Sequence, residues 1–197
     1  MRLNKVEFAA MNNPIRRLMQ RRLEFRTFKG SLKEHNIDLK GKIILDAGCG
    51  SGYSSQLIIN EFNPAKLVAF DFMPEQIELA KKRFLNADFF IGDATRMELA
   101  SESFDAVFIF GILHHIPQWK KAVSEVARVL KGQGVLLVEE ISRSGVLFFN
   151  RLGFIHPKDA LFDWPEFREE LVLNGFEILE EKNIILKRFK SFLCLKK

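Results

Sequence analysis

The stretch Lys42-Ile43-Ile44-Leu45-Asp46-Ala47-Gly48-Cys49-Gly50-Ser51-Gly52-Tyr53-Ser54-Ser55 decides the fold of this chain. A β-branched apolar run ends in a carboxylate, glycines follow at alternate positions, and hydroxyl side chains lead into a segment typical of a helix start. The pattern predicts a strand, a tight turn and a helix N-terminus. Glycine suits such a turn because a Cβ would hinder positive φ angles and the approach of backbone N–H groups to a ligand. We therefore interpret the turn as a ligand-binding loop.

The spacing of the glycines distinguishes between nucleotide ligands. The dinucleotide fingerprint Gly-x-Gly-x-x-Gly/Ala does not fit, because counting from Gly48 gives Tyr53 and counting from Gly50 gives Ser55. The pattern Asp-x-Gly-x-Gly-x-Gly instead resembles the S-adenosylmethionine (SAM) loop of class I SAM-dependent methyltransferases, in the type 11 and ubiquinone-biosynthesis branch. The resemblance implies that SAM, and its product S-adenosylhomocysteine, is bound by Asp46, Gly48, Cys49, Gly50 and Gly52.

The composition predicts one soluble globular domain. The chain has 197 residues, of which 47% are hydrophobic and 28% charged. No apolar run reaches the roughly 18 residues of a membrane span, and no signal peptide is evident, so we expect a cytoplasmic protein. The two cysteines, Cys49 and Cys194, have neither disulfide nor zinc-site spacing.

Helical and strand patterns alternate along the chain until a final pair of strands. We predict an α/β, Rossmann-like fold, in which a seven-stranded and mostly parallel sheet has helices on both faces and a C-terminal antiparallel hairpin. An N-terminal amphipathic helical cover (1–41) would precede the SAM-binding part (42–197) of a single domain. The patterns place helices at 53–62, 74–84, 119–130 and 164–174, and strands at 67–70, 88–91, 103–110, 135–138, 176–185 and 188–196.

The N-terminal segment is basic and amphipathic. Asn12-Asn13-Pro14 predicts a helix start, and apolar residues then recur at helical spacing: Ile15, Leu18, Met19 and Leu23. The resemblance implies a cover over the cofactor cleft, whereas the pattern alone is equally typical of a packing helix. The arginines between the apolar positions suit nucleic acid, anionic lipid or an acidic substrate, and also a solvated helix face.

Acidic or aromatic residues end the next strands of the predicted sheet. Asp71 lies roughly 20 residues past the glycine loop, where a carboxylate meets a ribose hydroxyl in nucleotide-binding folds; a cap for the following helix is compatible with that role. By resemblance, Phe72 and Met73 flank the adenine, Asp93 accepts from its amino group, and the Ala94 N–H serves a ring nitrogen. The same resemblance places the methionine part of SAM at Phe110 and Gly111.

The pair His114-His115 follows the fourth predicted strand. Imidazole titrates near neutrality, so His115 or His114 is a candidate general base on a methyl acceptor; a loop histidine that caps or packs is the alternative. We expect no metal here, because adjacent histidines rarely aim at one ion and no carboxylate follows at ligand spacing. Residues 142–162 are interpreted either as a substrate-side lid carrying Phe148, Phe149, Phe154 and Ile155, or as an ordinary packed connection.

The resemblance implies a methyltransferase, and the aromatic segment and the basic helix favour a small, apolar or anionic acceptor. The Asn/Asp-Pro-Pro-Tyr motif of base-amino methyltransferases is replaced by Phe110-Gly111-Ile112-Leu113, so no specific nucleic acid is expected. Peripheral membrane contact through the basic helix is an open alternative. So are a lipid or nucleic-acid acceptor and a protein that binds SAM or S-adenosylhomocysteine without turnover. The oligomeric state cannot be inferred from the sequence.

Overall fold

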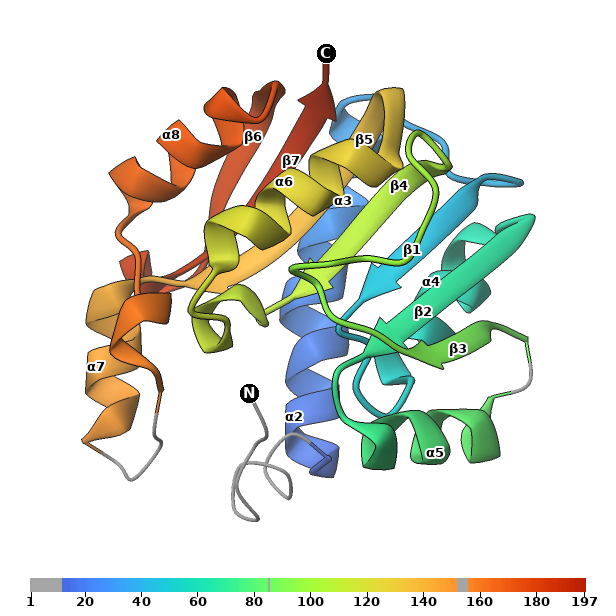
Figure 1. Cartoon of the computed structure of the whole chain (residues 1–197), viewed down its shortest axis with the longest axis horizontal. Coiled ribbons are helices and arrows are strands. Elements are labelled where there is room, and N and C mark those ends of the chain that lie inside the picture. The colour runs from blue at the N-terminus through green and yellow to red at the C-terminus, as the bar shows by residue number, and fades with distance from the viewer. Residues whose placement is uncertain (1–11, 85, 152–155) are drawn as a thin grey trace.

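A single mixed sheet runs through the molecule. The computed structural model describes residues 12–84, 86–151 and 156–197, and within them the strand order is β3-β2-β1-β4-β5-β7-β6 (Figure 1). The first five strands are parallel, and β7 runs antiparallel to both β5 and β6. This confirms the predicted fold class, including the C-terminal hairpin. The strands are β1 Ile43–Ala47, β2 Lys66–Asp71, β3 Asp88–Ile91, β4 Phe104–Phe110, β5 Leu130–Ile141, β6 Phe176–Ile185 and β7 Phe189–Lys196.

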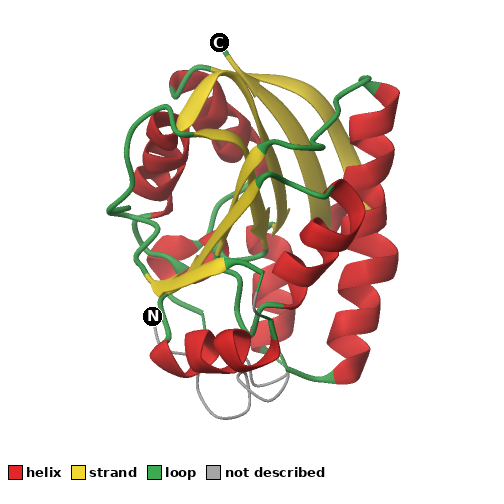
Figure 2. Ribbon diagram, turned by 90° about the vertical axis from the view of Figure 1, so that its right-hand side faces the viewer, coloured by secondary structure: helices red, strands yellow, loops and turns green. Residues whose placement is uncertain are grey.

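Helices cover both faces of the sheet (Figure 2). One face packs against α6 and α8, and the other against the N-terminal helix, α4 and α5. No described helix is both long and apolar enough to cross a membrane. The helices are α2 Pro14–Met19, η1 Gln20–Phe25, α3 Arg26–Glu34, α4 Tyr53–Phe62, α5 Pro74–Arg83, α6 Trp119–Val129, α7 Arg143–Asn150 and α8 Trp164–Leu173, with short turns η2 Leu113–His115, η3 Lys158–Ala160 and η4 Leu186–Arg188.

The N-terminal helix begins as predicted but buries a different face. Asn13 caps it by accepting a hydrogen bond from the Ile15 N–H at 2.8 Å, and Pro14 follows the cap. The predicted apolar stripe is nevertheless exposed, with Ile15 68% and Leu18 47% accessible. These side chains therefore do not form the packed face of the helix.

A π-helical turn explains this exposure. In a regular helix Leu18 would share a face with the buried Phe25, seven residues later. Residues 20–25 instead form a π-helix, whose i→i+5 hydrogen bonds add one residue to the turn. Because of this extra residue, Arg17 and not Leu18 lies on the same side of the helix as Phe25. The face of the helix that carries the arginines therefore turns toward the sheet.

The glycine loop between β1 and α4 has the backbone that its sequence predicts. Gly48, Gly50 and Gly52 have φ angles of 79°, 53° and 85°, a region that residues with a Cβ rarely adopt. The Gly48 and Cys49 N–H groups both donate to the Phe70 carbonyl at 2.9 Å. The end of β2 thus holds the loop that follows β1.

Asp46 is an internal support for this loop. It is fully buried near the end of β1, and its Oδ2 accepts hydrogen bonds from the Ser54 and Ser55 hydroxyls at 2.7 and 2.6 Å. The carboxylate thereby ties the strand to the first turn of α4. Burial raises its pKa from 3.8 to about 6, against the opposing effect of the two hydroxyl donors.

The raised pKa of Asp46 predicts a pH-dependent cost to folding. The unfolded state releases this proton near pH 3.8 and the folded state near pH 6, so stability falls as pH rises through that interval and the loss is complete above it. The variant Asp46→Asn stays uncharged. We expect its free energy of unfolding, relative to the parent protein, to rise by about 2.4 kcal/mol between about pH 4 and pH 7 in urea titrations.

Asp88→Asn is the matched control, because that carboxylate is exposed at the start of β3 and forms an ion pair with the exposed Lys66. Its stability difference from the parent should stay within about 0.5 kcal/mol across the same range. A flat difference for Asp46→Asn as well would mean that the buried carboxylate is not destabilised in the folded state.

Candidate functional site

A cleft of about 390 Å³ opens at the carboxyl ends of the parallel strands. This is the edge at which open α/β sheets bind ligands, and the volume is within the range of small-molecule sites. The N-terminal helix forms one wall, and the loops after β1, β2, β3 and β4 form the rest. Its lining includes Arg16, Arg17, Gln20, Gly48, Cys49, Gly50, Tyr53, Phe70, Asp71, Phe72, Met73, Gln76, Asp93, Ala94, Phe110, Gly111, Ile112, His115, Ile116 and Pro117.

The glycine loop divides into residues that face the cleft and residues that shape the loop. A Cβ at Gly50 would meet no atom within 4 Å, so the backbone there lies open to the cleft, beside Cys49. A Cβ at Gly48 would lie 2.6 Å from Ile112, and one at Gly52 would lie 2.7 Å from Phe84. Gly48 lines the cleft and Gly52 does not.

Two of the predicted cofactor ligands lie outside the cleft lining and make contacts within the protein. Gly52 precedes the first turn of α4 and permits close packing against α5, because Phe84 and Ala80 occupy the space of a side chain. Asp46 is likewise absent from the cleft lining, since its carboxylate points to the hydroxyls of α4. A direct contact of either residue with the cofactor stays a prediction.

Asp71 connects the glycine loop with the next helix. Its Oδ2 accepts a hydrogen bond from the Gly50 N–H at 3.0 Å, and its Oδ1 accepts one from the Met73 N–H at 2.9 Å. Burial raises its pKa, although both donors act in the opposite direction. Asp71 lines the cleft together with Met73 and the half-exposed Phe72, so the predicted ribose-binding residue and its neighbours are all accessible to a ligand.

The ends of β3 and β4 supply the remaining predicted contacts. Asp93 and Ala94 line the cleft, and Asp93 Oδ1 accepts hydrogen bonds from the Thr95 N–H and hydroxyl, both at 2.8 Å. Phe110 and Gly111 line it at the end of β4, where Gly111 has a φ of 62°. Residues far apart in the sequence thus meet at one cleft, as the motif series predicts.

The polar wall on the N-terminal helix was not predicted residue by residue. Arg16 and Glu24 form a bidentate ion pair, with N–O distances of 2.6 and 3.0 Å. Arg17 lies over the Tyr53 ring, 5.6 Å from its centroid, and its Nε is buried without a hydrogen-bond acceptor among the described residues. The arginines line the cleft because the π-helical turn directs them there. The periodicity of the sequence does not indicate such a turn, so this wall could not be predicted.

Buried carboxyl groups outnumber buried cations beside the cleft. Glu139 and Glu140, at the end of β5, are 3% and 0% exposed, and Glu24 is 7% exposed. Arg16 is the cation paired with Glu24. Burial raises the pKa of Glu139 well above its ordinary value and that of Glu140 to about 8. A ligand that brings positive charge to this region would offset the burial of these carboxylates.

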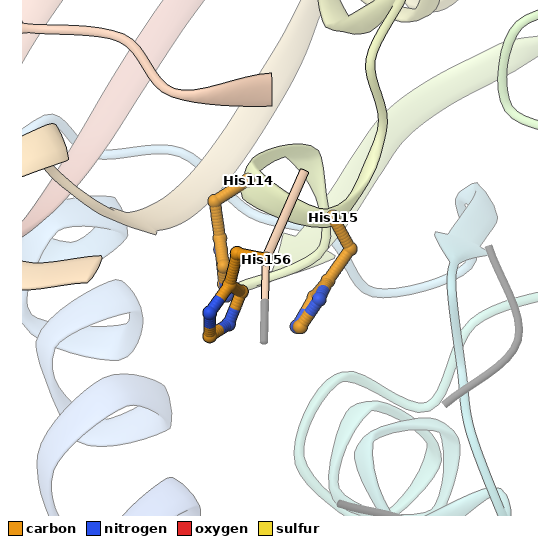
Figure 3. Close-up of side chains that lie close together, drawn as sticks. All are labelled: His114, His115 and His156. Carbon is orange, nitrogen blue, oxygen red and sulfur yellow. The ribbon is translucent and has the colours of Figure 1, made fainter. Parts of the chain in front are cut away.

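The two adjacent histidines differ in environment. His115 lines the cleft, whereas His114 does not, and its Nδ1 lies 2.7 Å from Oε2 of the buried Glu140. Burial lowers the pKa of His114 to about 3, and the nearby His156 and Arg16 act in the same direction. An imidazole with so low a pKa is a weak base, so His115 is the stronger candidate for proton transfer. His156, before η3, joins the pair (Figure 3).

The segment interpreted as a lid contributes no described residue to the cleft. Phe149 packs against Phe189 and Phe148, and Phe148 is 45% exposed under Arg188. Phe154 and Ile155 lie outside the described residues. Among the described residues of this segment, His156 lies near the site, because its ring packs against the rings of His114 and His115.

Known proteins match the part of the chain that builds this cleft. A family model for the methyltransferase domain matches residues 44–134. A demethylmenaquinone methyltransferase of Renibacterium salmoninarum is 38% identical over 102 residues, which are 52% of this chain and 42% of that protein. A phthiotriol/phenolphthiotriol dimycocerosates methyltransferase of Mycobacterium tuberculosis is 34% identical over 100 residues, 50% of this chain and 37% of that protein. The chain spans less than half the length of these curated relatives.

Solved structures share the whole fold. A SAM-dependent methyltransferase of Aquifex aeolicus superposes with a TM-score of 0.74 at 17% identity, over 100% of both chains. Another, of Mesorhizobium loti, gives a TM-score of 0.71 at 13% identity, over 85% of this chain and 96% of that one. At such low identity these structures establish the fold alone. Residues 44–134 therefore match the methyltransferase domain family, and the chain as a whole has the fold of class I SAM-dependent methyltransferases.

Proposed function

We propose that this protein binds SAM in the cleft and transfers its methyl group to a small, apolar or anionic acceptor. One observation carries the proposal: the open backbone at Gly50, the Asp71 carboxylate and the Phe110–Gly111 edge come from separate βα units and line a single cleft. The methyltransferase names of the curated relatives support the same reaction class.

The residues present fit this cofactor. The open backbone at Gly50 accommodates an atom that a Cβ would displace. The buried Nε of Arg17 offers a donor to a carboxylate, as in the amino-acid part of SAM. The surplus of buried carboxyl groups, Glu139 among them, suits a cationic ligand.

Catalysis in this proposal is mainly positioning. Bound SAM supplies a methyl group on a sulfonium, so the chain needs no covalent nucleophile of its own. Alignment of two bound reactants supplies roughly 7 to 11 kcal/mol of a barrier. The apolar side chains of Phe110 and Ile112 in the lining would exclude water from the reacting groups. His115, also in the lining, would accept the proton of an oxygen or carbon acceptor.

An apolar acceptor is favoured by the wall near His115, where Ile112, Ile116 and Pro117 line the cleft. The relatives named for demethylmenaquinone and for phthiotriol or phenolphthiotriol dimycocerosates make quinone-like and lipid compounds the first acceptors to test. An anionic acceptor is the second choice, because Arg16 and Arg17 line the opposite wall. Binding without turnover is the competing function.

The reaction is tested by incubating the protein with SAM labelled in its methyl group and with quinone-like, thiol and phospholipid acceptors. We expect label in an organic-phase product, and about 100-fold slower transfer by His115→Ala with little change in SAM affinity. Thermal stabilisation by SAM but transfer to none of the acceptors would favour the non-catalytic binder. Stabilisation by NADH and not by SAM would rule out the cofactor assignment.

The glycine loop provides a matched pair of substitutions. Gly50 and Gly41 both have positive φ angles, 53° and 69°, and open space at the Cβ position, but only Gly50 lines the cleft. Each change to Ala should cost about 1 kcal/mol of stability. We expect Gly50→Ala to weaken SAM binding at least tenfold, about 1.4 kcal/mol in calorimetry, and Gly41→Ala to leave it unchanged. Equal SAM affinities would place the cofactor elsewhere.

Arg17 tests the orientation of the cofactor. If its guanidinium holds the carboxylate of SAM, Arg17→Met should lower the affinity for SAM and S-adenosylhomocysteine about tenfold. The affinity for 5′-methylthioadenosine, which lacks the amino-acid carboxylate, should not change. Arg21→Met is the control, because Arg21 is exposed on the same helix. An equal loss for all three ligands would show that Arg17 shapes the cleft and does not bind the carboxylate.

A further inference from the structure

Three of the four histidines of the chain form one cluster. His114 and His115 belong to η2, and His156 approaches from the connection between α7 and η3 (Figure 3). Each residue offers a ring nitrogen, and these nitrogens all lie within 4.8 Å of one another. The ring centroids of His114 and His115 are 4.2 Å apart, and that of His156 lies 5.3 and 4.7 Å from theirs. The cluster therefore depends on a contact between two segments that are about 40 residues apart in the sequence.

Two of these rings have an oxygen partner at Nδ1. Nδ1 of His114 lies 2.7 Å from Oε2 of Glu140, and Nδ1 of His156 lies 2.6 Å from Oδ1 of Asn150. An imidazole that donates Nδ1–H to an oxygen presents the lone pair of Nε2. A carboxylate or carbonyl behind the ring is the usual arrangement around a metal-bound histidine, because it fixes both the tautomer and the ring orientation.

Packing alone does not account for this arrangement. Three imidazoles that all become protonated would repel one another, whereas three neutral imidazoles with Nε2 lone pairs are a ligand set for a borderline-soft cation. Glu140 is fully buried behind His114, so it would counter the charge of an ion held by the histidines.

We propose that His114, His115 and His156 form a binding site for one divalent transition-metal ion, with Zn²⁺ as the preferred ion. Three imidazoles with an open fourth position are the ligand set of catalytic zinc sites. Tetrahedral Zn–N bonds of about 2.1 Å place ligand nitrogens about 3.4 Å apart. Starting from nitrogens that lie within 4.8 Å of one another, binding would draw them together by up to about 1.4 Å, which is within reach of side-chain rotation.

The site borders the cofactor cleft, because His115 is part of the cleft lining. An ion there would take solvent, or an oxygen or thiol group of the methyl acceptor, as its fourth ligand, and would lower the pKa of that group. This role in acceptor binding rests on the proposed function, whereas the metal site itself does not. The expectation from sequence that no metal binds considered only the adjacent pair and not His156.

The experiment uses the untagged full-length chain, stripped with a chelator and titrated with Zn²⁺ in a calorimeter and with Co²⁺ in a visible-absorption cell. We expect one ion per chain and the intense absorption of tetrahedral Co²⁺. His156→Ala should weaken Zn²⁺ binding at least 100-fold. His35→Ala is the matched control, because His35 is the fourth histidine and pairs with Glu180 away from the cluster; it should bind Zn²⁺ like the parent protein.

A second variant keeps the test independent of folding defects. Asn150→Ala removes the oxygen beside His156 Nδ1 and leaves all three ligands, so we expect Zn²⁺ binding about tenfold weaker with an unchanged stoichiometry. Circular dichroism of each variant reports whether it is folded. Absence of stoichiometric binding, or equal affinities of the parent and folded His156→Ala proteins, would overturn the proposal. Neither titration contains SAM, so zinc binding without SAM binding would retain this site and reject the proposed function.

Discussion

The two hydrogen bonds accepted by Asp71 are the interaction on which the cleft depends. One oxygen accepts from the Gly50 N–H and the other from the Met73 N–H, so a single carboxylate fixes the loop after β1 against the turn after β2. The Phe70 carbonyl adds two further acceptor contacts to the same loop. Neighbouring parallel strands end at the same edge of the sheet, so a side chain at the end of one strand can organise the loop that follows another. The glycine-rich backbone can adopt many conformations, and these contacts select one.

Electrostatics sets the character of the opposite side of the cleft. Glu24, Glu139 and Glu140 are buried, and the Arg16 guanidinium pairs with Glu24. Burying carboxylates without compensation is costly, so their raised pKa values mean that protons supply part of the missing positive charge. A bound cation would replace those protons. The same charge imbalance is thus compatible with a cationic ligand in the cleft and with a metal ion on the histidines, because Glu139 lies beside Gly111 of the cleft lining and Glu140 lies beside His114.

The sequence predicted the elements more accurately than the contacts. α4, β3 and β6 have the predicted bounds, since their apolar periodicity and their turn residues agree. The cleft residues that end strands, such as Asp71 and Asp93, were also found, because strand ends of a parallel sheet converge. Asp46 and Gly52, which were predicted with the cofactor ligands, lie outside the cleft lining, since the residues that shape a loop and the residues that line its cleft belong to the same motif. The π-turn and the approach of His156 were missed because neither leaves a periodic signal, and the second depends on packing between distant segments.

The π-turn also divides the N-terminal helix into two functional halves. Phe28 and Leu32 of α3 are buried against the sheet and anchor that half in the core. α2 has no buried residue in the described structure, and its polar side chains face the cleft. The described contacts that hold α2 in place include the Arg16–Glu24 ion pair and the cation–π contact of Arg17 with Tyr53. Both contacts are weaker than a buried apolar interface. The helix thus combines a rigid base with an end whose position is set by charges at the cleft. That end is therefore the wall of the cleft that a charged ligand can most readily reposition.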